Sequence, residues 1–329
     1  MTRHSGFDES DVRVRPGRGS RPRSKIRPQH ADATEAMVTV VDRGRWRCAL
    51  GADPGRPVTA MRARELGRTP IVVGDRVDLV GDLSGATDAL ARIVRVHERS
   101  TTLLRTVDDS DATQRLVVAN AEQLVVVTAV ADPEPRTGFV DRCLVAAYAG
   151  GLTPVLCLTK ADLADPEPFA AYYRDLEFPV LRTRRDQPAD ELAALLAGRV
   201  SALVGHSGVG KSTLVNSLLP AAEQRTGVVS GVGKGRHTTV AAIALPIDGG
   251  GWVIDTPGVR SFGLAHVSPD DVIDAFDDLA DAVDECPRGC GHLGPPADPE
   301  CALDVLVAAG ELSPRRLEAL RRVLVALRL

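Results

Sequence analysis

The stretch "RVSALVGHSGVGKSTLVNSLLP", residues 199–220, decides the fold of this chain. An apolar run typical of a buried strand leads into Gly205-His-Ser-Gly-Val-Gly-Lys-Ser212, and a run with helical spacing leads out of it. The glycines allow the backbone to wrap around a phosphate group, whose charge meets the exposed N–H groups of the helix start. The pattern G-x(4)-G-K-[ST] therefore predicts a strand, a phosphate-binding loop and a helix.

Every residue of this loop is a predicted nucleotide contact. The set is Gly205, His206, Ser207, Gly208, Val209, Gly210, Lys211, Ser212 and Thr213. Lys211 is predicted to reach the β- and γ-phosphates, and Ser212 to ligate Mg²⁺ that arrives with the nucleotide.

A second phosphate motif is Asp255-Thr-Pro-Gly258, which follows the strand-like run "GGWVI" and lies 50 residues after Gly205. An aspartate at this place can hold Mg²⁺ through water, and the Gly258 N–H can contact the γ-phosphate. Alone, D-x-P-G is a common turn, and its spacing from the phosphate loop favours the functional interpretation.

The base-reading motif stands in an unexpected place. Thr159-Lys160-Ala161-Asp162 ends the apolar run "TPVLCL" and is similar to Asn-Lys-x-Asp, by which GTPases read guanine, yet it precedes the phosphate loop. Either the four letters are an accident or the domain is circularly permuted. A sheet whose original ends lie close together can be cut elsewhere without changing its fold. The other motifs keep the usual order, which favours the permutation and GTP or GDP as the ligand.

Composition and periodicity divide the chain into four predicted regions. These are a disordered basic arm (1–33), a barrel of five short strand-like runs (34–110), an α/β domain with a mainly parallel sheet (111–266) and a helical tail (267–329). The barrel fits an OB-fold, with an SH3-like barrel as the alternative. In the tail, Ser268-Pro269 and Ser313-Pro314 predict helix starts, the first with an apolar stripe that runs to Val283.

Four residues of the tail predict a metal site. Cys286, Cys290, His292 and Cys301 provide three thiolates and one imidazole, the ligand set of a closed tetrahedral zinc centre. We expect one structural Zn²⁺ per chain; the alternative is a group of free buried thiols.

Other classes of protein are disfavoured by composition. No run approaches 18 apolar residues and no apolar segment follows the charged N-terminus, so we expect a cytoplasmic protein without a membrane span. Trp46 is the only aromatic residue between Ala36 and Leu104, which argues against recognition of single strands by serial stacking. Arginine contacts to the phosphates of structured RNA fit better.

The joint pattern resembles the RsgA/YjeQ family. It is carried by "SGVGKSTLVNSL", "GRHTT", "DTPGVRSFGL" and the upstream "VVGDRV". The resemblance implies a circularly permuted P-loop GTPase with an N-terminal OB-fold barrel and a C-terminal helical zinc-binding domain. It also implies a GTPase that acts on the small (30S) ribosomal subunit and its rRNA late in assembly, with subunit-stimulated turnover; we expect a monomer.

Hydrolysis needs a group that positions water. Val259 stands where Ras-type enzymes have a glutamine, and valine cannot make a hydrogen bond through its side chain. His237, on a glycine-rich segment, is the catalytic candidate on chemical grounds, and the family implies the same; a cap or a solvent-facing histidine is the alternative. Thr238 or Thr239 is expected to ligate Mg²⁺.

Two departures from the family concern the base. Thr159 replaces the usual asparagine, and the segment expected to carry a Ser-Ala base contact reads "LRTRRDQ", so a second contact is expected near Thr183. Two other functions stay open at this point: a metal-handling GTPase that delivers zinc to client proteins, and an RNA-binding protein that uses GTP as a structural ligand. An exposed, incomplete metal site would favour the metal-handling GTPase. Absence of GTP turnover would favour the RNA-binding protein.

Overall fold

The computed structural model describes residues 30–51, 53–108, 111–219, 242–256, 264 and 267–328. Most of the predicted arm therefore lies outside the described residues, as do His237, Thr238, Thr239 and Gly258. Within the described part, no helix combines the length and the apolar character needed to cross a membrane.

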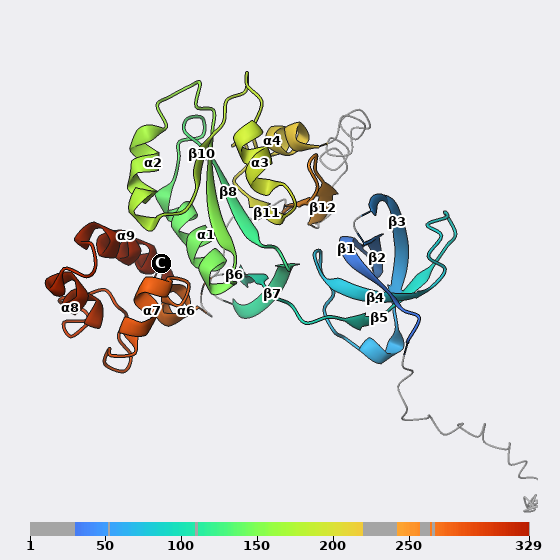
Figure 1. Cartoon of the computed structure of the whole chain (residues 1–329), viewed down its shortest axis with the longest axis horizontal. Coiled ribbons are helices and arrows are strands. Elements are labelled where there is room, and N and C mark those ends of the chain that lie inside the picture. The colour runs from blue at the N-terminus through green and yellow to red at the C-terminus, as the bar shows by residue number, and fades with distance from the viewer. Residues whose placement is uncertain are drawn as a thin grey trace, which may run out of the picture. The chain divides into compact units, whose positions relative to one another are not determined.

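Five strands close into the predicted barrel (Figure 1). They are β1 (Thr34–Asp42), β2 (Arg45–Leu50), β3 (Asp53–Arg62), β4 (Arg76–Gly81) and β5 (Ala91–Val96). The strand order is β1-β2-β3-β5-β4, and β4 pairs again with β1. The pairing of β3 with β5 is parallel, whereas the other pairs are antiparallel. This closed five-stranded arrangement is that of an OB-fold, so the prediction is confirmed over the SH3-like alternative.

A hairpin links the barrel to the α/β sheet. Its strands are β6 (Thr102–Asp108) and β7 (Asp111–Ala119), so the boundary expected at residue 110 lies between two strands of one hairpin. The "VVGDRV" motif forms the joint: a Cβ on Gly74 would lie 1.9 Å from the Ala119 carbonyl oxygen. The buried Asp75 carboxylate accepts from Arg99 Nε at 2.7 Å, which fixes the same turn.

The α/β domain is a parallel sheet with one antiparallel edge strand. Its strands are β8 (Gln123–Ala129), β9 (Thr153–Thr159), β10 (Val180–Arg182), β11 (Val200–Val204), β12 (Ile243–Pro246) and β13 (Trp252–Asp255), in the order β10-β9-β8-β11-β13-β12. The antiparallel strand is β12, which also pairs with β1 at Val40 and Ile243. The helices are α1 (Thr137–Ala149), α2 (Glu167–Tyr173), α3 (Asp190–Leu196) and α4 (Lys211–Leu218).

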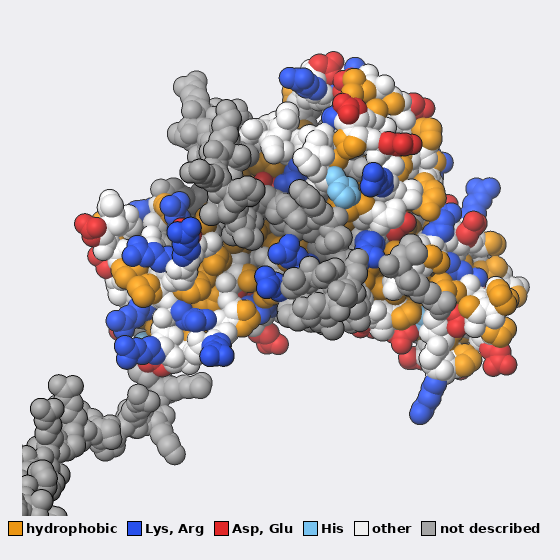
Figure 2. All heavy atoms as spheres, turned by 180° about the vertical axis from the view of Figure 1, so that it is seen from behind, with side chains coloured by type: hydrophobic (Ala, Val, Ile, Leu, Met, Phe, Trp, Pro, Cys, Tyr) orange, Lys and Arg blue, Asp and Glu red, His pale blue; other side chains and the backbone are white. Residues whose placement is uncertain are grey.

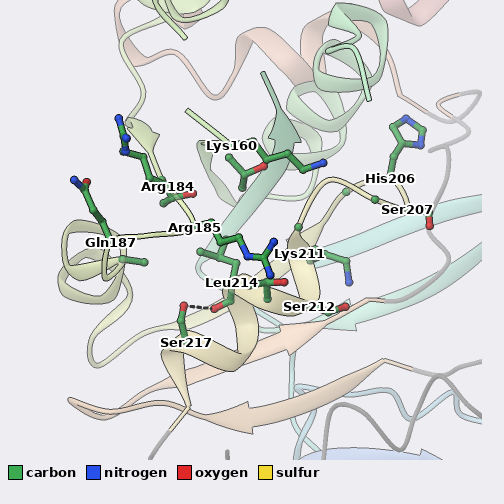
Figure 3. Close-up of a pocket in the computed structure, with 17 residues that line it drawn as sticks. Lys160, Arg184, Arg185, Gln187, His206, Ser207, Lys211, Ser212, Leu214 and Ser217 are labelled. Carbon is green, nitrogen blue, oxygen red and sulfur yellow. Dashed lines mark hydrogen bonds between the residues drawn. The ribbon is translucent and has the colours of Figure 1, made fainter. Parts of the chain in front are cut away.

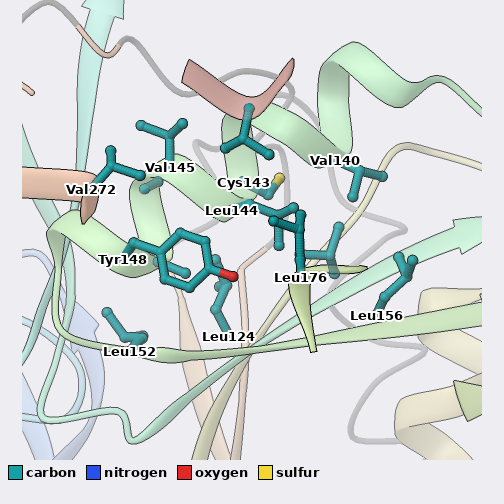
Figure 4. Packing of buried hydrophobic residues seen from close by; sticks show 14 of the residues in the cluster. Leu124, Val140, Cys143, Leu144, Val145, Tyr148, Leu152, Leu156, Leu176 and Val272 are labelled. Atoms are coloured by element: carbon teal, nitrogen blue, oxygen red, sulfur yellow. The ribbon is translucent and has the colours of Figure 1, made fainter. Parts of the chain in front are cut away.

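Alternate residues of the same strands serve two hydrophobic cores. Leu124 and Leu156 pack with α1 and α2 on one face of the sheet, as Figure 4 shows around Leu144. Val125 and Val155 pack with α3 and α4 on the other. Burial on both faces explains why these strands read as continuous apolar runs.

The tail contains four α-helices in its described part: α6 (Pro269–Ile273), α7 (Asp277–Val283), α8 (Ala302–Ala309) and α9 (Pro314–Val325), the last followed by a 3-10 turn (Ala326–Arg328). Both predicted helix starts are confirmed; Ser268 caps α6 in a capping box with Asp271, whereas Ser313 begins α9 without a side-chain cap. The prediction of one continuous helix from Ser268 to Val283 was wrong. The chain leaves the helical conformation at Phe276, whose ring packs 4.7 Å from that of Tyr148 on α1.

Arginines of α9 bond the tail to the sheet domain. Arg316 Nη1 lies 2.8 Å from Glu177 Oε2, and Arg322 donates to the Tyr172 carbonyl at 2.8 Å. The Arg322 guanidinium also lies 4.3 Å from the centre of the Tyr172 ring. These arginines therefore hold α9 against the sheet domain.

Candidate nucleotide site and metal centre

The sheet brings the nucleotide motifs to one edge. Strand β8 lies between β9 and β11, with Ala129 opposite Thr159 and Val126 opposite Val204. Asp255 ends β13 opposite Leu203 of β11. Because carboxyl ends of parallel strands share an edge, the base-reading motif and the phosphate loop meet although their order in the chain is reversed.

The phosphate loop has the backbone geometry that its glycines permit. Gly208 and Gly210 have φ values of 85° and 90°, which other residues rarely adopt. A Cβ on Gly205 would lie 2.6 Å from the Val127 carbonyl oxygen, so no larger residue fits where the loop leaves β11. Lys211 then begins α4, whose first N–H groups face the loop.

A buried hydroxyl joins the base-reading motif to the phosphate loop. Thr159 Oγ1 lies 2.5 Å from the Val209 carbonyl oxygen and 3.3 Å from that of Thr128. Thr159 is only 5% exposed, and its single hydroxyl proton is directed to the shorter contact. The sequence did not reveal this bond, because its partners are 50 residues apart.

The charged side chains of the phosphate site are paired. Lys211 Nζ contacts Asp255 Oδ1 in an ion pair that is 11% and 16% exposed at its two side chains. Beside it, the Thr256 hydroxyl donates to the Leu203 carbonyl at 2.6 Å, which holds the end of β13 against β11. Lys211, predicted to contact the phosphates, and Asp255, predicted to hold Mg²⁺, therefore lie side by side.

A cavity of about 720 Å³ runs along this edge (Figure 3). Its lining includes Thr159, Lys160, Thr183, Arg184, Arg185, Gln187, Ala189, Gly205, His206, Ser207, Gly208, Gly210, Lys211, Ser212, Thr213, Leu214 and Ser217. Asp162 is exposed in the turn just beyond Lys160 and is not among these lining residues. The Ala161 N–H donates to the Thr183 carbonyl at 3.1 Å, so the segment after β10 lies beside the base-reading motif.

Further contacts shape the two ends of the cavity. At the phosphate end, the His206 ring packs against Phe139 of α1, with ring centres 4.0 Å apart. At the other end, the hydrogen bond with Asp186 raises the pKa of Arg184, and the nearby charge of Asp162 adds to this shift. The sequence predicted a base contact near Thr183, but it did not indicate that Arg184 and Arg185 line the cavity.

The four predicted metal ligands form one cluster. The donor atoms of Cys286, Cys290, His292 and Cys301 lie within 4.8 Å of one another. Nδ1 of His292 is 3.5 Å from Cys286 Sγ and 3.9 Å from Cys301 Sγ. Bonds of about 2.0–2.3 Å to a tetrahedral zinc ion would separate such atoms by roughly 3.6–3.8 Å, so the cluster fits zinc.

A carboxylate of α6 orients the histidine. Asp270 Oδ1 lies 2.8 Å from His292 Nε2, and because a carboxylate only accepts, this contact places the ring proton on Nε2 and turns Nδ1 to the thiols. Asp298 accepts from the N–H groups of Gly291 and Leu293 at 3.0 and 2.9 Å. His292 is only 2% exposed, which describes a closed centre and disfavours metal delivery.

Burial opposes ionisation of the thiols. It raises the pKa of Cys290 to about 12, and it also raises the pKa of Cys286. Because zinc binds the thiolate, metal binding at neutral pH must release these protons.

The permuted order of motifs, with the base-reading turn placed beside the phosphate loop, defines a circularly permuted P-loop GTPase. The family model for RsgA GTPase matches residues 96–265. Over 267 residues the chain is 40% identical to "Small ribosomal subunit biogenesis GTPase RsgA" of Pseudomonas fluorescens, covering 78% of this chain and 75% of that one. The chain belongs to the RsgA GTPase family, which confirms the resemblance.

Other relatives and solved structures agree. The protein of the same name from Gemmatimonas aurantiaca is 38% identical over 260 residues, covering 77% of this chain and 83% of that one. YjeQ from Thermotoga maritima is 26% identical, with a TM-score of 0.64, over 90% of this chain and 99% of that one. YloQ, described as a circularly permuted GTPase, is 21% identical with a TM-score of 0.63 over 91% and 96%; at that identity it supports the fold alone.

Proposed function

We propose that this GTPase acts in biogenesis of the small (30S) ribosomal subunit, binding the subunit through its rRNA and hydrolysing GTP to GDP and phosphate faster when bound. The observation that carries the proposal is the 40% identity, over 78% of the chain, to a relative named for that role. We place the protein in the cytoplasm as a monomer.

The nucleotide would lie along the cavity. Residues 205–213 hold the phosphates, with Lys211 at the β- and γ-phosphates, while Thr159, Lys160 and Asp162 form the base end. Ser212, Asp255 and either Thr238 or Thr239 hold Mg²⁺, and Gly258 contacts the γ-phosphate. Support comes from the meeting of these motifs at one sheet edge.

The Lys211–Asp255 pair suggests how binding is balanced. Phosphate oxygens attract the lysine ammonium, and Mg²⁺ attracts the carboxylate. Binding of nucleotide with its metal thus exchanges one partly buried ion pair for two favourable contacts.

His237 is proposed to orient the attacking water. A neutral imidazole near pH 7 can accept the water's proton as it attacks the γ-phosphate. Since the Val259 side chain offers no hydrogen bond, we expect slow basal turnover and faster turnover when a bound partner places His237 beside the water.

We propose four regions: a basic arm (1–33), a barrel (34–110), the catalytic domain (111–266) and a tail that holds a structural Zn²⁺ (267–329). The arm and the barrel are proposed to bind the subunit. Seven basic residues and no acid lie between Arg13 and Arg27. Exposed arginines also lie on the barrel strands; they include Arg45, Arg47, Arg76 and Arg92. Figure 2 shows many Lys and Arg side chains on one face of the described surface, as phosphate contacts require.

The decisive experiment measures GTP turnover with and without purified small subunits, at low and high salt. We expect strong acceleration at low salt that declines as salt rises, because phosphate contacts release counterions. His237→Ala should remove most of the stimulated rate and spare binding of GTP and subunits. If subunits do not accelerate turnover at low salt, the ribosomal role is wrong.

A further inference from the structure

One wall of the nucleotide cavity is formed by the segment that follows β10. Its start is fixed beside the base-reading motif, because the Thr183 N–H donates to the Leu158 carbonyl at 2.8 Å and the Thr183 carbonyl accepts from Ala161 at 3.1 Å. The next residues, Arg184, Arg185 and Gln187, line the cavity, and Figure 3 shows them on the side away from His206 and Ser207. This wall therefore belongs to the base end of the cavity.

A guanine base presents two kinds of group along its edge. Asp162 can accept from the N1 and N2 donors, but the O6 and N7 acceptors need donors from the protein. The Thr159 hydroxyl cannot serve, since its proton is directed to the Val209 carbonyl at 2.5 Å. The Thr183 hydroxyl lies 3.9 Å from Cys157 Sγ of β9 and offers a single proton, so it cannot serve both acceptors. Backbone N–H groups of this segment can supply one donor, and the other side chains of the cavity are the remaining source.

The cations of the cavity differ in what they already contact. Arg184 Nε lies 3.2 Å from Asp186 Oδ1, Lys160 contacts the Asp132 carbonyl, and Lys211 contacts Asp255. Arg185 also lines the cavity, and among the described residues its guanidinium has no ion pair or hydrogen bond. In Figure 3 the Arg185 side chain points into the cavity.

We propose that Arg185 determines base specificity by donating two hydrogen bonds, one to O6 and one to N7 of guanine. A guanidinium matches these two acceptors in one plane, and the same pairing is the commonest specific arginine contact to guanine in nucleic acids. Arg185 and Asp162 would then read the whole polar edge of the base. The inference rests on the proposed guanine-nucleotide site.

The test compares GDP with 7-deaza-GDP, in which a C–H group replaces N7, on the full-length chain by calorimetry. Arg185→Ala should weaken GDP binding roughly tenfold. The unsubstituted chain should bind 7-deaza-GDP about fivefold more weakly than GDP, whereas Arg185→Ala should bind the two equally. Arg185→Lys should behave as Arg185→Ala does, because an ammonium lacks the planar pair of donors.

Arg182→Ala, at an exposed arginine of β10 outside the cavity lining, is the control and should keep both the affinity and the analogue discrimination. The inference is overturned if Arg185→Ala weakens GDP and 7-deaza-GDP by the same factor, or if Arg185→Lys restores binding, since either result indicates a contact to phosphate or ribose. It is also overturned if Arg184→Ala abolishes the discrimination instead. Failure of the guanine site itself has a different signature: the unsubstituted chain would not prefer guanine to adenine nucleotides, and Asp162→Asn would not improve xanthosine nucleotide binding.

Discussion

The nucleotide cavity and the metal centre are built in opposite ways. The contacts that shape the cavity join residues far apart in the chain: Thr159 bonds to Val209 across 50 positions and Lys211 pairs with Asp255 across 44. In the metal centre, His292 lies six positions from Cys286 and nine from Cys301. The cavity therefore requires the assembled sheet, whereas the centre requires one short loop. Damage to one site should leave the other largely intact.

One contact of the metal centre reaches further along the chain. Asp270, on the first helix after the sheet domain, bonds to His292 from 22 positions away. This helix follows Asp255 by only 14 positions. The metal centre thus begins close in sequence to the nucleotide motifs, and for this reason the Cys290 and Lys211 variants are tested at both sites.

The largest effect is expected from removing a metal ligand. Structural zinc contributes about 10 kcal/mol or more to folding of small metal-binding units, so Cys290→Ser should lose the metal and unfold the tail. Nucleotide affinity should stay roughly intact. Elemental analysis and thermal unfolding with and without chelator provide the measurements, and Cys48→Ala, in the barrel core, is the control that keeps one zinc per chain. A purified chain without zinc and without thermal response to chelator would contradict the centre.

The next effect concerns Lys211. Lys211→Ala removes a charge contact in a largely buried site and should weaken GDP binding at least about 30-fold. Lys211→Arg should fail similarly, because a guanidinium does not replace a compact ammonium that fits inside the loop. Only four of the 40 basic residues are lysines, and two of them lie in the nucleotide motifs. Calorimetry gives the affinity, and unchanged zinc content is the expected control; a loss of zinc would show that the two sites depend on each other.

A smaller effect is expected at the carboxylate that orients the metal-binding histidine. Asp270→Asn removes the charge that holds the His292 ring and should lower zinc affinity roughly tenfold. Asp271→Asn is matched to it, since this neighbour caps the same helix through Ser268 and does not contact the histidine. Competition with a chelating dye measures the affinity. Equal losses in the two variants would mean that helix stability, and not the histidine contact, determines metal binding.

What the sequence could predict follows the same division. The metal ligands needed only local spacing, and all four came together. The phosphate loop and Asp255 were also predicted, because short motifs carry their own backbone geometry. Contacts between strands were not predicted, because no local pattern indicates the Thr159–Val209 bond or the position of Arg185 in the cavity wall. In the tail, the apolar stripe to Val283 suggested one helix, but the chain leaves the helical conformation at Phe276, whose ring packs on Tyr148 of α1, a contact without a local signal.

The smallest predicted effect tests the bond that makes the cavity depend on the whole sheet. Thr159→Val keeps the shape of the side chain and removes the hydroxyl, which leaves the buried Val209 carbonyl without its donor. A lost hydrogen bond of this kind costs about 1 kcal/mol, equivalent to roughly fivefold in GDP affinity. The guanine preference over adenine and xanthine should not change, since this hydroxyl points to the loop and not to the base, and Thr159→Ser should retain affinity. If Thr159→Val instead alters base preference at unchanged GDP affinity, Thr159 contacts the base directly, and the phosphate loop is held by its own glycines without support from β9.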